Sequence, residues 1–222
     1  MGYFGYYVAI MALTYLVQYP PLLIGLVVIF LARRFVPDPL VLFRTFGRIS
    51  QLRGQIDANP QNVTARRDLA VIYLDRLRPG AALALLEQAL GRFPDDAELL
   101  YLKGLAHYRR GEHERALGPL VRAVELDPRV RFGQPYLVAG DALAALGRFE
   151  EAVDSYERFV HASGSSIEGH VKLARALKRT KDTDGRKKAL EEAFVTWRSI
   201  PGYARRNQVG WWMRAHLDAL VG

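Results

Sequence analysis

The stretch AELLYLKGLAHYRRGEHERALGPLVRAVELDP, residues 97–128, decides the fold of this 222-residue chain. It contains two apolar-patterned segments, separated at Gly111, and it ends on Pro128. Proline also stands at Pro60 and Pro94, so the same step recurs at intervals of 34 residues. Glycine accepts the positive φ that often follows a helix, and proline cannot continue one. The stretch therefore predicts a pair of antiparallel helices that repeats along the chain.

Within this pair, small and large residues stand where two helices would meet. Gly104 and Ala116 would let the helices approach closely, and Leu120 would fill the space between them. The arrangement resembles the tetratricopeptide repeat (TPR), in which small, aromatic and large apolar residues recur at fixed places. The residues that carry the resemblance are Gly104, Tyr108, Ala116, Leu120, Ala123 and Pro128, with Tyr108 one place late because His107 takes the usual aromatic position.

Three further units repeat the pattern. The unit before it holds Leu69, Ala70, Tyr73, Ala82, Leu86, Ala89 and Pro94. The unit after it slips by two residues beyond Pro128 and then holds Tyr136, Gly140, Leu143, Ala152, Tyr156 and Phe159. The last unit is weaker and holds Leu173, Ala174, Leu177, Leu190 and Ala193, with Arg186 at a position where the family has alanine. Terminal repeats are often irregular.

The fold class that follows is all-α: a TPR solenoid of about four helix-turn-helix repeats with capping helices, preceded by an N-terminal transmembrane helix. The predicted division is a transmembrane anchor at 1–36, a juxtamembrane capping helix at 37–59, TPR repeats at 60–200 and a C-terminal capping helix at 201–222. In the last helix we expect Trp211, together with Met213 or Leu217, to face inward.

Residues 2–32 contain no Asp, Glu, Lys, Arg or His. The run exceeds the ~20 apolar residues that cross a bilayer, and it lacks the basic start of a cleaved export signal. Pro20 and Pro21 interrupt it, which leaves two geometries: one kinked span from about Val8 to Leu31, which we favour, or a shallow hairpin turned by the prolines. Either way, we expect an uncleaved attachment to a membrane.

Basic residues follow the apolar run and none precedes it. The arginines are Arg33, Arg34, Arg44, Arg48 and Arg53. Because positive charge is retained on the cytoplasmic side, the repeats are predicted to face the cytoplasm of a single-pass membrane protein, with a bacterial inner membrane as the expected location. The order of elements is also similar to the LapB family of lipopolysaccharide-assembly TPR proteins, although this chain has no cysteine and so lacks their rubredoxin-like module. Mitochondrial import receptors share the same plan, so the organism stays open.

The TPR resemblance implies that a protein partner, a peptide or a helix, binds the concave face of the solenoid. Transferring the family's groove positions predicts a partner-binding groove that is apolar and aromatic in its middle and basic at its C-terminal end. Its predicted members are Arg67, Val71, Leu74, Tyr101, Leu105, Tyr108, Arg109, Leu137, Asp141, Val171, Arg175, Lys178 and Arg179.

The sequence contains no constellation that indicates catalysis. There is no cysteine, the five histidines are scattered, and no phosphate-binding or nucleophile motif occurs. We therefore expect no metal, no cofactor and no enzymatic activity, and we interpret the chain as a membrane-anchored adaptor or scaffold. The net charge of +8 is concentrated next to the apolar run and in residues 172–222. The alternative is therefore nucleic-acid or anionic-lipid binding through the basic C-terminal region, with nucleic acid the less favoured partner.

Overall fold

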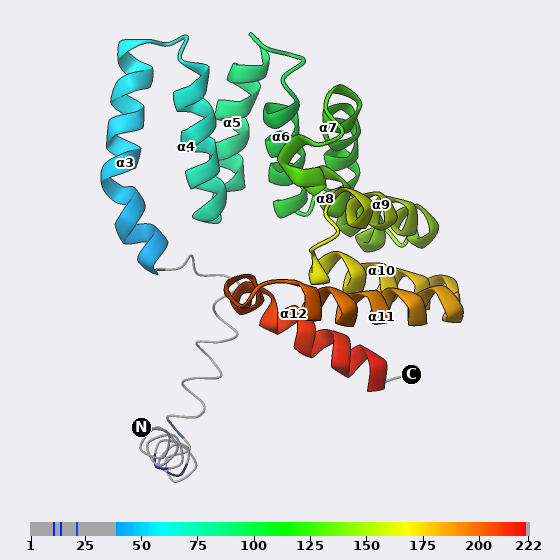
Figure 1. Ribbon diagram of the computed structural model, residues 1–222. Helices are drawn as coiled ribbons and strands as arrows, with labels where there is room; N and C mark the ends of the chain where they lie inside the picture. Colours follow the sequence, from blue (N-terminus) through cyan, green and yellow to red (C-terminus); the bar gives the residue numbers. More distant parts are fainter. Residues whose placement is uncertain (1–10, 12–13, 15–20, 22–38, 221–222) are drawn as a thin grey trace.

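The computed structural model describes residues 39–220, together with the isolated positions Met11, Thr14 and Pro21 (Figure 1). Its elements are α3 (Pro39–Ala58), α4 (Val63–Asp75), α5 (Pro79–Leu90), α6 (Ala97–Arg109), α7 (His113–Leu126), the 3₁₀ turn η1 (Val130–Gly133), α8 (Gln134–Ala145), α9 (Phe149–Ala162), α10 (Ile167–Thr180), α11 (Thr183–Ser199) and α12 (Gly202–Leu220). The described chain is all-α, as the sequence predicted.

The predicted anchor at 1–36 lies outside the described residues, apart from those three positions. Within the part that is described, no helix combines the length and the apolar character needed to cross a bilayer. The predicted membrane span therefore stays a prediction. Helix α3 falls within the range predicted for the juxtamembrane cap, and α12 within that of the C-terminal cap.

Consecutive helices pack in antiparallel pairs: α4 with α5, α6 with α7, α8 with α9, and α10 with α11. Two glycines allow two of the pairs to approach closely. A Cβ on Gly104 would lie 2.5 Å from Leu120 Cγ, and one on Gly140 would lie 2.5 Å from Tyr156 Cε1. Gly111, between α6 and α7, has φ of +78°, as expected for a residue that ends a helix in the left-handed region. The small residues of the repeat therefore act as predicted.

Side chains cap several of the helix starts. Oxygens of Asn62, Asp96, Ser166 and Asp182 accept hydrogen bonds from the backbone N–H three residues later, at the starts of α4, α6, α10 and α11. Each satisfies one backbone donor that the helix itself leaves free. These caps fix where each helix begins and so keep the repeats in register.

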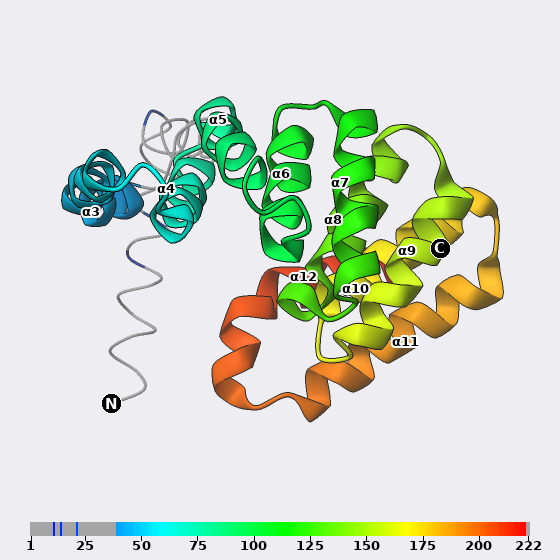
Figure 2. The same ribbon diagram turned by 90° about the horizontal axis from the view of Figure 1, so that it is seen from above.

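Three steps bring successive first helices together, since α4 contacts α6, α6 contacts α8, and α10 contacts α12; α8 and α10 are linked through the Lys172–Asp141 ion pair. Within the described residues the second helices α5, α7, α9 and α11 make no comparable contacts with each other. The first helices therefore line the inner, shorter side of a superhelix, and the second helices line its outer side. Figure 1 shows α3 to α7 standing upright while α10 and α11 run across them, and Figure 2 shows the same turn from above.

The apolar interior is divided into two clusters. The first runs from α3 to the start of η1 and includes fully buried Leu86 and Leu99, together with Val138 and Ala139 of α8. The second runs from α8 to α12 and includes buried Phe159 and Val171. Helix α8 thus contributes side chains to both clusters, and the solenoid turns at this helix.

The two-residue slip after Pro128 corresponds to η1. Its residues Arg131 and Phe132 have φ of 49° and 56°, and Gly133 has φ of 76°. Glycine tolerates this left-handed conformation, but each of the other two residues loses about 1–2 kcal/mol by adopting it. The third repeat is therefore attached through a strained turn.

Helix α12 corrects one prediction from the sequence. Trp211 is half-buried against the second cluster as expected, but Met213 and Leu217 are 55% and 59% exposed, and the buried residue of the helix is Ala215. The reason is the face that α12 presents to α10. Gln208 accepts a hydrogen bond from the Ile167 backbone N–H, while further along α12 Trp211 lies beside α10. Met213 and Leu217 project from other sides of the helix.

Candidate partner-binding surface

The predicted groove residues lie on the first helices α4, α6, α8 and α10, which form the concave side of the solenoid. Four of them are core residues and not surface residues: Leu74, Tyr101, Leu137 and Val171, with exposed fractions of 8% or less. Their side chains are buried because each first helix must bury one side to hold the solenoid together. This corrects the sequence-based assignment for these four positions.

Val71, Leu105 and Tyr108 are half-buried, and all three pack against the first core cluster. Each presents the remainder of its side chain at the surface of α4 or α6. They form the apolar centre of the concave face. The sequence predicted an apolar centre for the groove, and partner binding at these three side chains stays a prediction.

A chain of ion pairs runs along the N-terminal half of the concave face. Arg67 Nη1 lies 3.2 Å from Glu98 Oε2, and the other carboxylate oxygen of Glu98 lies 3.3 Å from Arg131 Nε. Arg67 Nη2 also lies 3.1 Å from Asp68 Oδ1, whose second oxygen is 3.9 Å from Arg48 Nη2. The pairs connect α3, α4, α6 and η1. Each is partly exposed and individually worth less than about 1 kcal/mol, but the shared partners hold the chain together as a network.

A more buried network connects α8, α9 and α10. Lys172 Nζ lies 2.7 Å from Asp141 Oδ2 and 2.7 Å from Glu168 Oε1, and the Tyr156 hydroxyl donates to Asp141 Oδ1 at 2.7 Å. Burial alone would lower the pKa of Lys172, but the two carboxylates outweigh it and the pKa is raised. Burial, together with the Asp141 carboxylate, raises the pKa of Tyr156. Asp141 is therefore already occupied by partners within the chain.

The basic end of the groove is partly neutralised. Arg175 Nε lies 2.7 Å from Asp218 Oδ2 of α12, and the Arg179 guanidinium lies over the Phe149 ring at 4.6 Å. Arg175, Arg179, Lys178 and Arg109 are all exposed. The structure thus keeps a basic surface at the end of α10, but α12 supplies a carboxylate to it.

Phe132 is the most exposed large aromatic side chain near this face, at 82%, and sequence reasoning missed it. A hollow at one edge of the groove is lined by Tyr101 of α6, by Arg131 and Phe132 of η1, by Gln134 of α8, and by residues 162–165 at the end of α9 and in the turn that follows it. The TPR pattern assigns positions only to residues within the helices, so it says nothing about a residue that is inserted between two repeats. The slip after Pro128 was the available signal.

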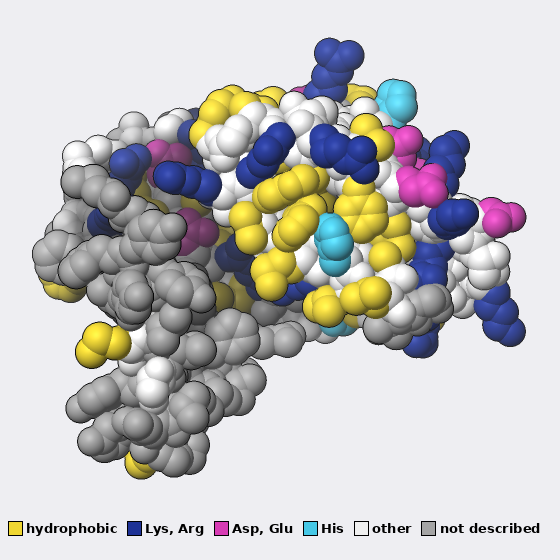
Figure 3. Space-filling view, turned by 60° about the horizontal axis from the view of Figure 1, so that its bottom comes forward, with side chains coloured by type: hydrophobic (Ala, Val, Ile, Leu, Met, Phe, Trp, Pro, Cys, Tyr) yellow, Lys and Arg dark blue, Asp and Glu magenta, His cyan; other side chains and the backbone are white. Residues whose placement is uncertain are grey.

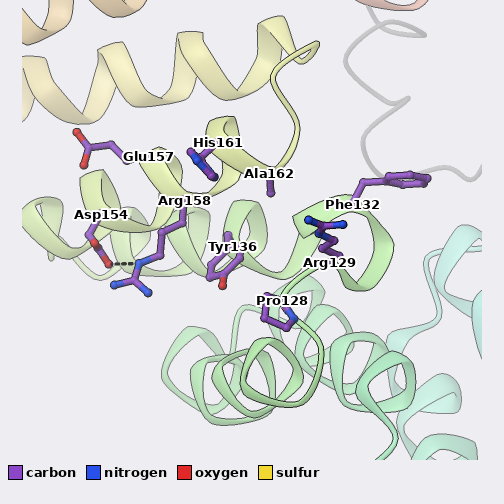
Figure 4. Close-up of a pocket in the computed structure, with 9 residues that line it drawn as sticks. All are labelled: Pro128, Arg129, Phe132, Tyr136, Asp154, Glu157, Arg158, His161 and Ala162. Carbon is purple, nitrogen blue, oxygen red and sulfur yellow. Dashed lines mark hydrogen bonds and ion pairs between the residues drawn. The ribbon is translucent and has the colours of Figure 1, made fainter.

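A second hollow, of about 630 Å³, lies between η1 and the outer side of α9 (Figure 4). Arg129, Tyr136 and His161 line it, and Asp154 Oδ2 lies 2.9 Å from Arg158 Nε across its wall. Figure 4 shows Phe132 pointing away from the other lining side chains. The strained turn therefore places the Phe132 side chain at the surface, between the two hollows.

The histidines of the described residues do not assemble a metal site: no three His, Asp or Glu side chains in residues 39–220 and the isolated positions could hold an ion together. His107 Nδ1 lies 2.6 Å from Glu112 Oε2, between α6 and the start of α7. His170 is buried in α10, where burial lowers its pKa. These side chains occupy structural positions.

Two family models described as tetratricopeptide repeat match the chain, at residues 67–130 and at residues 133–162. Together they cover α5 to α9 and most of α4, and the boundary between them falls at η1.

Two curated proteins illustrate the similarity in sequence. The small glutamine-rich tetratricopeptide repeat-containing protein 2 of Mycosarcoma maydis is 30% identical over 87 residues, which is 39% of this chain and 24% of that protein. A TPR repeat-containing protein of Methanocaldococcus jannaschii is 36% identical over 76 residues, which is 34% of this chain and 13% of that protein. The chain thus matches about a quarter of the first relative and about an eighth of the second.

Among solved structures, a crystal structure of MamA has a TM-score of 0.62 and 22% identity, covering 67% of this chain and 85% of that one. A MamA fragment from Desulfovibrio magneticus RS-1 has a TM-score of 0.55 and 21% identity, covering 60% and 75%. At these identities the likeness concerns the fold alone.

Proposed function

Because this chain carries tetratricopeptide repeats, we propose that it is a non-enzymatic scaffold that holds a protein partner, an extended peptide or a helix, against its concave face. The observation that carries the proposal is the row of half-buried apolar side chains Val71, Leu105 and Tyr108 on that face. Such side chains supply apolar contact area that is already held in place by the core, so a partner gains contacts at a low cost in ordering.

Positive charge at the ends of α6 and α10 favours a partner with an acidic portion. Arg109 lies at the end of α6, and Lys178 and Arg179 lie at the end of α10. All three are exposed. A partner that combines an apolar anchor with acidic residues fits both features, because complementary charge increases the rate and the selectivity of association.

We further propose that the scaffold is attached to a membrane through residues 1–36 and that its repeats face the cytoplasm of a bacterial cell. The support is the uncharged run at 2–32 and the arginines that follow it at Arg33 and Arg34. This location would confine the partner-binding face to a layer of cytoplasm next to the bilayer.

Site-specific photocrosslinking in intact cells tests the binding face. A photoreactive phenylalanine analogue is placed at Leu105 or Tyr108 on the concave side, and at Val121 as the matched control. Val121 is 50% exposed and lies on α7, on the outer side. We expect one discrete crosslinked protein from the concave positions and none from Val121. Absence of a product at the concave positions, or an equal product at Val121, would contradict the proposal.

Membrane attachment has a separate test. The full chain should sediment with membranes and resist extraction at alkaline pH, whereas a full-length variant with charged residues placed in 2–32 should be extracted. In spheroplasts, protease added from outside should leave the repeats intact. Digestion of the repeats under those conditions would reverse the proposed orientation.

A further inference from the structure

Helix α12 packs on the last repeat as the first helix of an additional repeat would. It contacts α10, the preceding first helix, and also α11. The contacts with α10 run in the same direction along both helices, from Gln208 beside Ile167 to Asp218 beside Arg175. Within the described residues, no second helix packs against α12 in turn. One side of α11 and α12 is therefore left without the cover that each earlier pair receives.

This uncovered side is apolar and aromatic. A hollow of about 560 Å³ is lined by Phe194, Trp197, Arg198, Trp212, His216, Ala219 and Leu220, and we call these residues the end face. The rings of Trp197 and Trp212 are stacked with centroids 5.1 Å apart, and the His216 ring lies 4.3 Å from that of Trp212. Proteins in solution rarely leave a contiguous apolar surface of this kind exposed, so it indicates a surface that something covers.

Exposed apolar side chains continue beyond the end face on the same two helices. They are Val195, Tyr203, Val209, Met213 and Leu217, each at least 41% exposed. Figure 3, which turns this end of the molecule forward, shows hydrophobic side chains gathered around a histidine, with Lys and Arg side chains along the edge.

The charges beside the end face are mostly positive. Arg205 lies over the Trp197 ring at 5.6 Å, and Arg214 lies over the Trp211 ring at 4.4 Å. Arg198 lines the hollow itself. The acidic residue of α12, Asp218, already pairs with Arg175 and accepts a hydrogen bond from Arg186 through its carbonyl oxygen. Tryptophan and tyrosine among arginines are the composition of surfaces that lie at the boundary between lipid head groups and acyl chains.

We propose that the end face lies on the anionic surface of a lipid bilayer. The inference rests on the proposed membrane location, because residues 2–32 would already hold the solenoid close to lipid. A second copy of the chain is a poorer occupant, since it would bring two arginine-rich rims together. An anionic lipid surface complements the rim, and each basic residue near such a surface contributes about 1 kcal/mol.

The tryptophans make the proposal measurable in the full chain. The protein has three, Trp197, Trp211 and Trp212, so its tryptophan emission reports on this end alone. The full chain is reconstituted into vesicles whose acyl chains are brominated and therefore quench nearby tryptophan. One variant, Trp211→Phe, keeps the two end-face reporters. The matched variant, with Trp197→Phe and Trp212→Phe, keeps only Trp211, which lies beside Lys172 of α10 and is not part of the end face.

We expect brominated anionic vesicles to quench the end-face reporters strongly and Trp211 weakly, with less quenching in neutral vesicles or in high salt. Met213→Glu or Leu217→Glu should abolish the quenching. Both side chains are more than half exposed, so circular dichroism should be unchanged. Val121→Glu on α7 is the control substitution and should leave the quenching intact.

The outcomes separate this inference from the proposed anchor. Chain that floats with vesicles but shows no quenching overturns the end-face contact and leaves the anchor standing. If lipid quenches the end-face tryptophans but alkaline washing removes the chain from the vesicles, the end-face contact is supported and the anchor is rejected. Absence of both flotation and quenching overturns both. A blue shift of end-face emission that depends on protein concentration, without quenching by lipid, would assign the face to a second copy and also overturn the inference.

Discussion

Gly104 and Gly140 show how single residues determine whether a helix pair can close. Each glycine faces a large side chain of the second helix, Leu120 in one pair and Tyr156 in the other. The added methyl group of an alanine would overlap these side chains. The two helices of each pair can therefore pack this closely only because glycine has no Cβ atom.

Gly104→Ala is expected to destabilise the protein by about 1–3 kcal/mol, the usual cost of overpacking a core. Gly54→Ala is the matched control, since Gly54 lies within α3 with no atom near the added methyl group. That change should stabilise by up to about 1 kcal/mol, because alanine favours helix. Chemical denaturation of the two variants measures both effects. Equal stability of the two would contradict the close approach seen at Gly104.

His170 gives the stability of the protein a pH dependence. Burial lowers its pKa below the ordinary value, and the nearby carboxylate of Glu192 opposes this only in part. In the window between the lowered folded pKa and the ordinary value, the unfolded chain binds more protons than the folded one. The contribution of His170 to the free energy of unfolding is therefore fully present above about pH 6.5, and it is lost as the pH falls through that window.

We expect His170→Leu to remove this component, so the melting temperature of the variant should fall less than that of the wild type between neutral pH and pH about 5. The contribution is at most about 1.4 kcal/mol per pH unit, since one proton is involved. If the melting temperatures of the two proteins fall by the same amount across that range, burial of His170 does not have this effect.

At the scale of elements, η1 combines strain with exposure. Phe132 adopts a left-handed conformation that glycine would adopt freely, and its ring is almost fully in solvent. Neither property stabilises the folded chain. A strained residue that exposes an aromatic ring fits a contact with the partner that we propose.

Phe132→Gly is therefore expected to stabilise the protein by about 1 kcal/mol or to leave it unchanged, because glycine relieves the left-handed strain. The same change should reduce the yield of the partner crosslinked through Leu105. Thermal melting and crosslinking are measured on the same variant. Lower stability together with an unchanged yield would assign Phe132 a structural role.

The elements also show what the sequence could predict. The 34-residue period and its small residues predicted the helix pairs, because packing of adjacent helices depends on local spacing. The same pattern could not separate Leu105, which keeps exposed surface, from Val171, which is buried, since both occupy groove positions of their helices. That difference depends on how neighbouring repeats are rotated, and the rotation changes at η1. The sequence Val130–Gly133 shows an insertion but not its left-handed backbone.

At the scale of the whole molecule, the two core clusters meet at α8 and share few side chains; Leu117 packs against both. In solenoids each repeat is stabilised mainly by its neighbours, so distant parts can unfold with different free energies. The division of the core at α8 is the natural boundary between two such parts.

Phe159→Ala should create a cavity in the second cluster and destabilise it by about 3–5 kcal/mol. Amide hydrogen exchange should then accelerate in α9 to α11 and stay slow in α4 to α6. Leu86→Ala, a change at a fully buried residue of the first cluster, should give the reverse pattern. Uniform acceleration in both variants would indicate that the described chain unfolds as one unit.

Asp218 connects the two surfaces for which we propose functions. Its carboxylate comes from α12, yet it pairs with Arg175 at the basic end of the groove, and its carbonyl oxygen receives Arg186. If α12 separated from α10, Arg175 and Arg186 would both lose their partner Asp218. The attraction that the proposed groove would exert on an acidic ligand is thus set by the docking of α12, the helix that follows the four pairs.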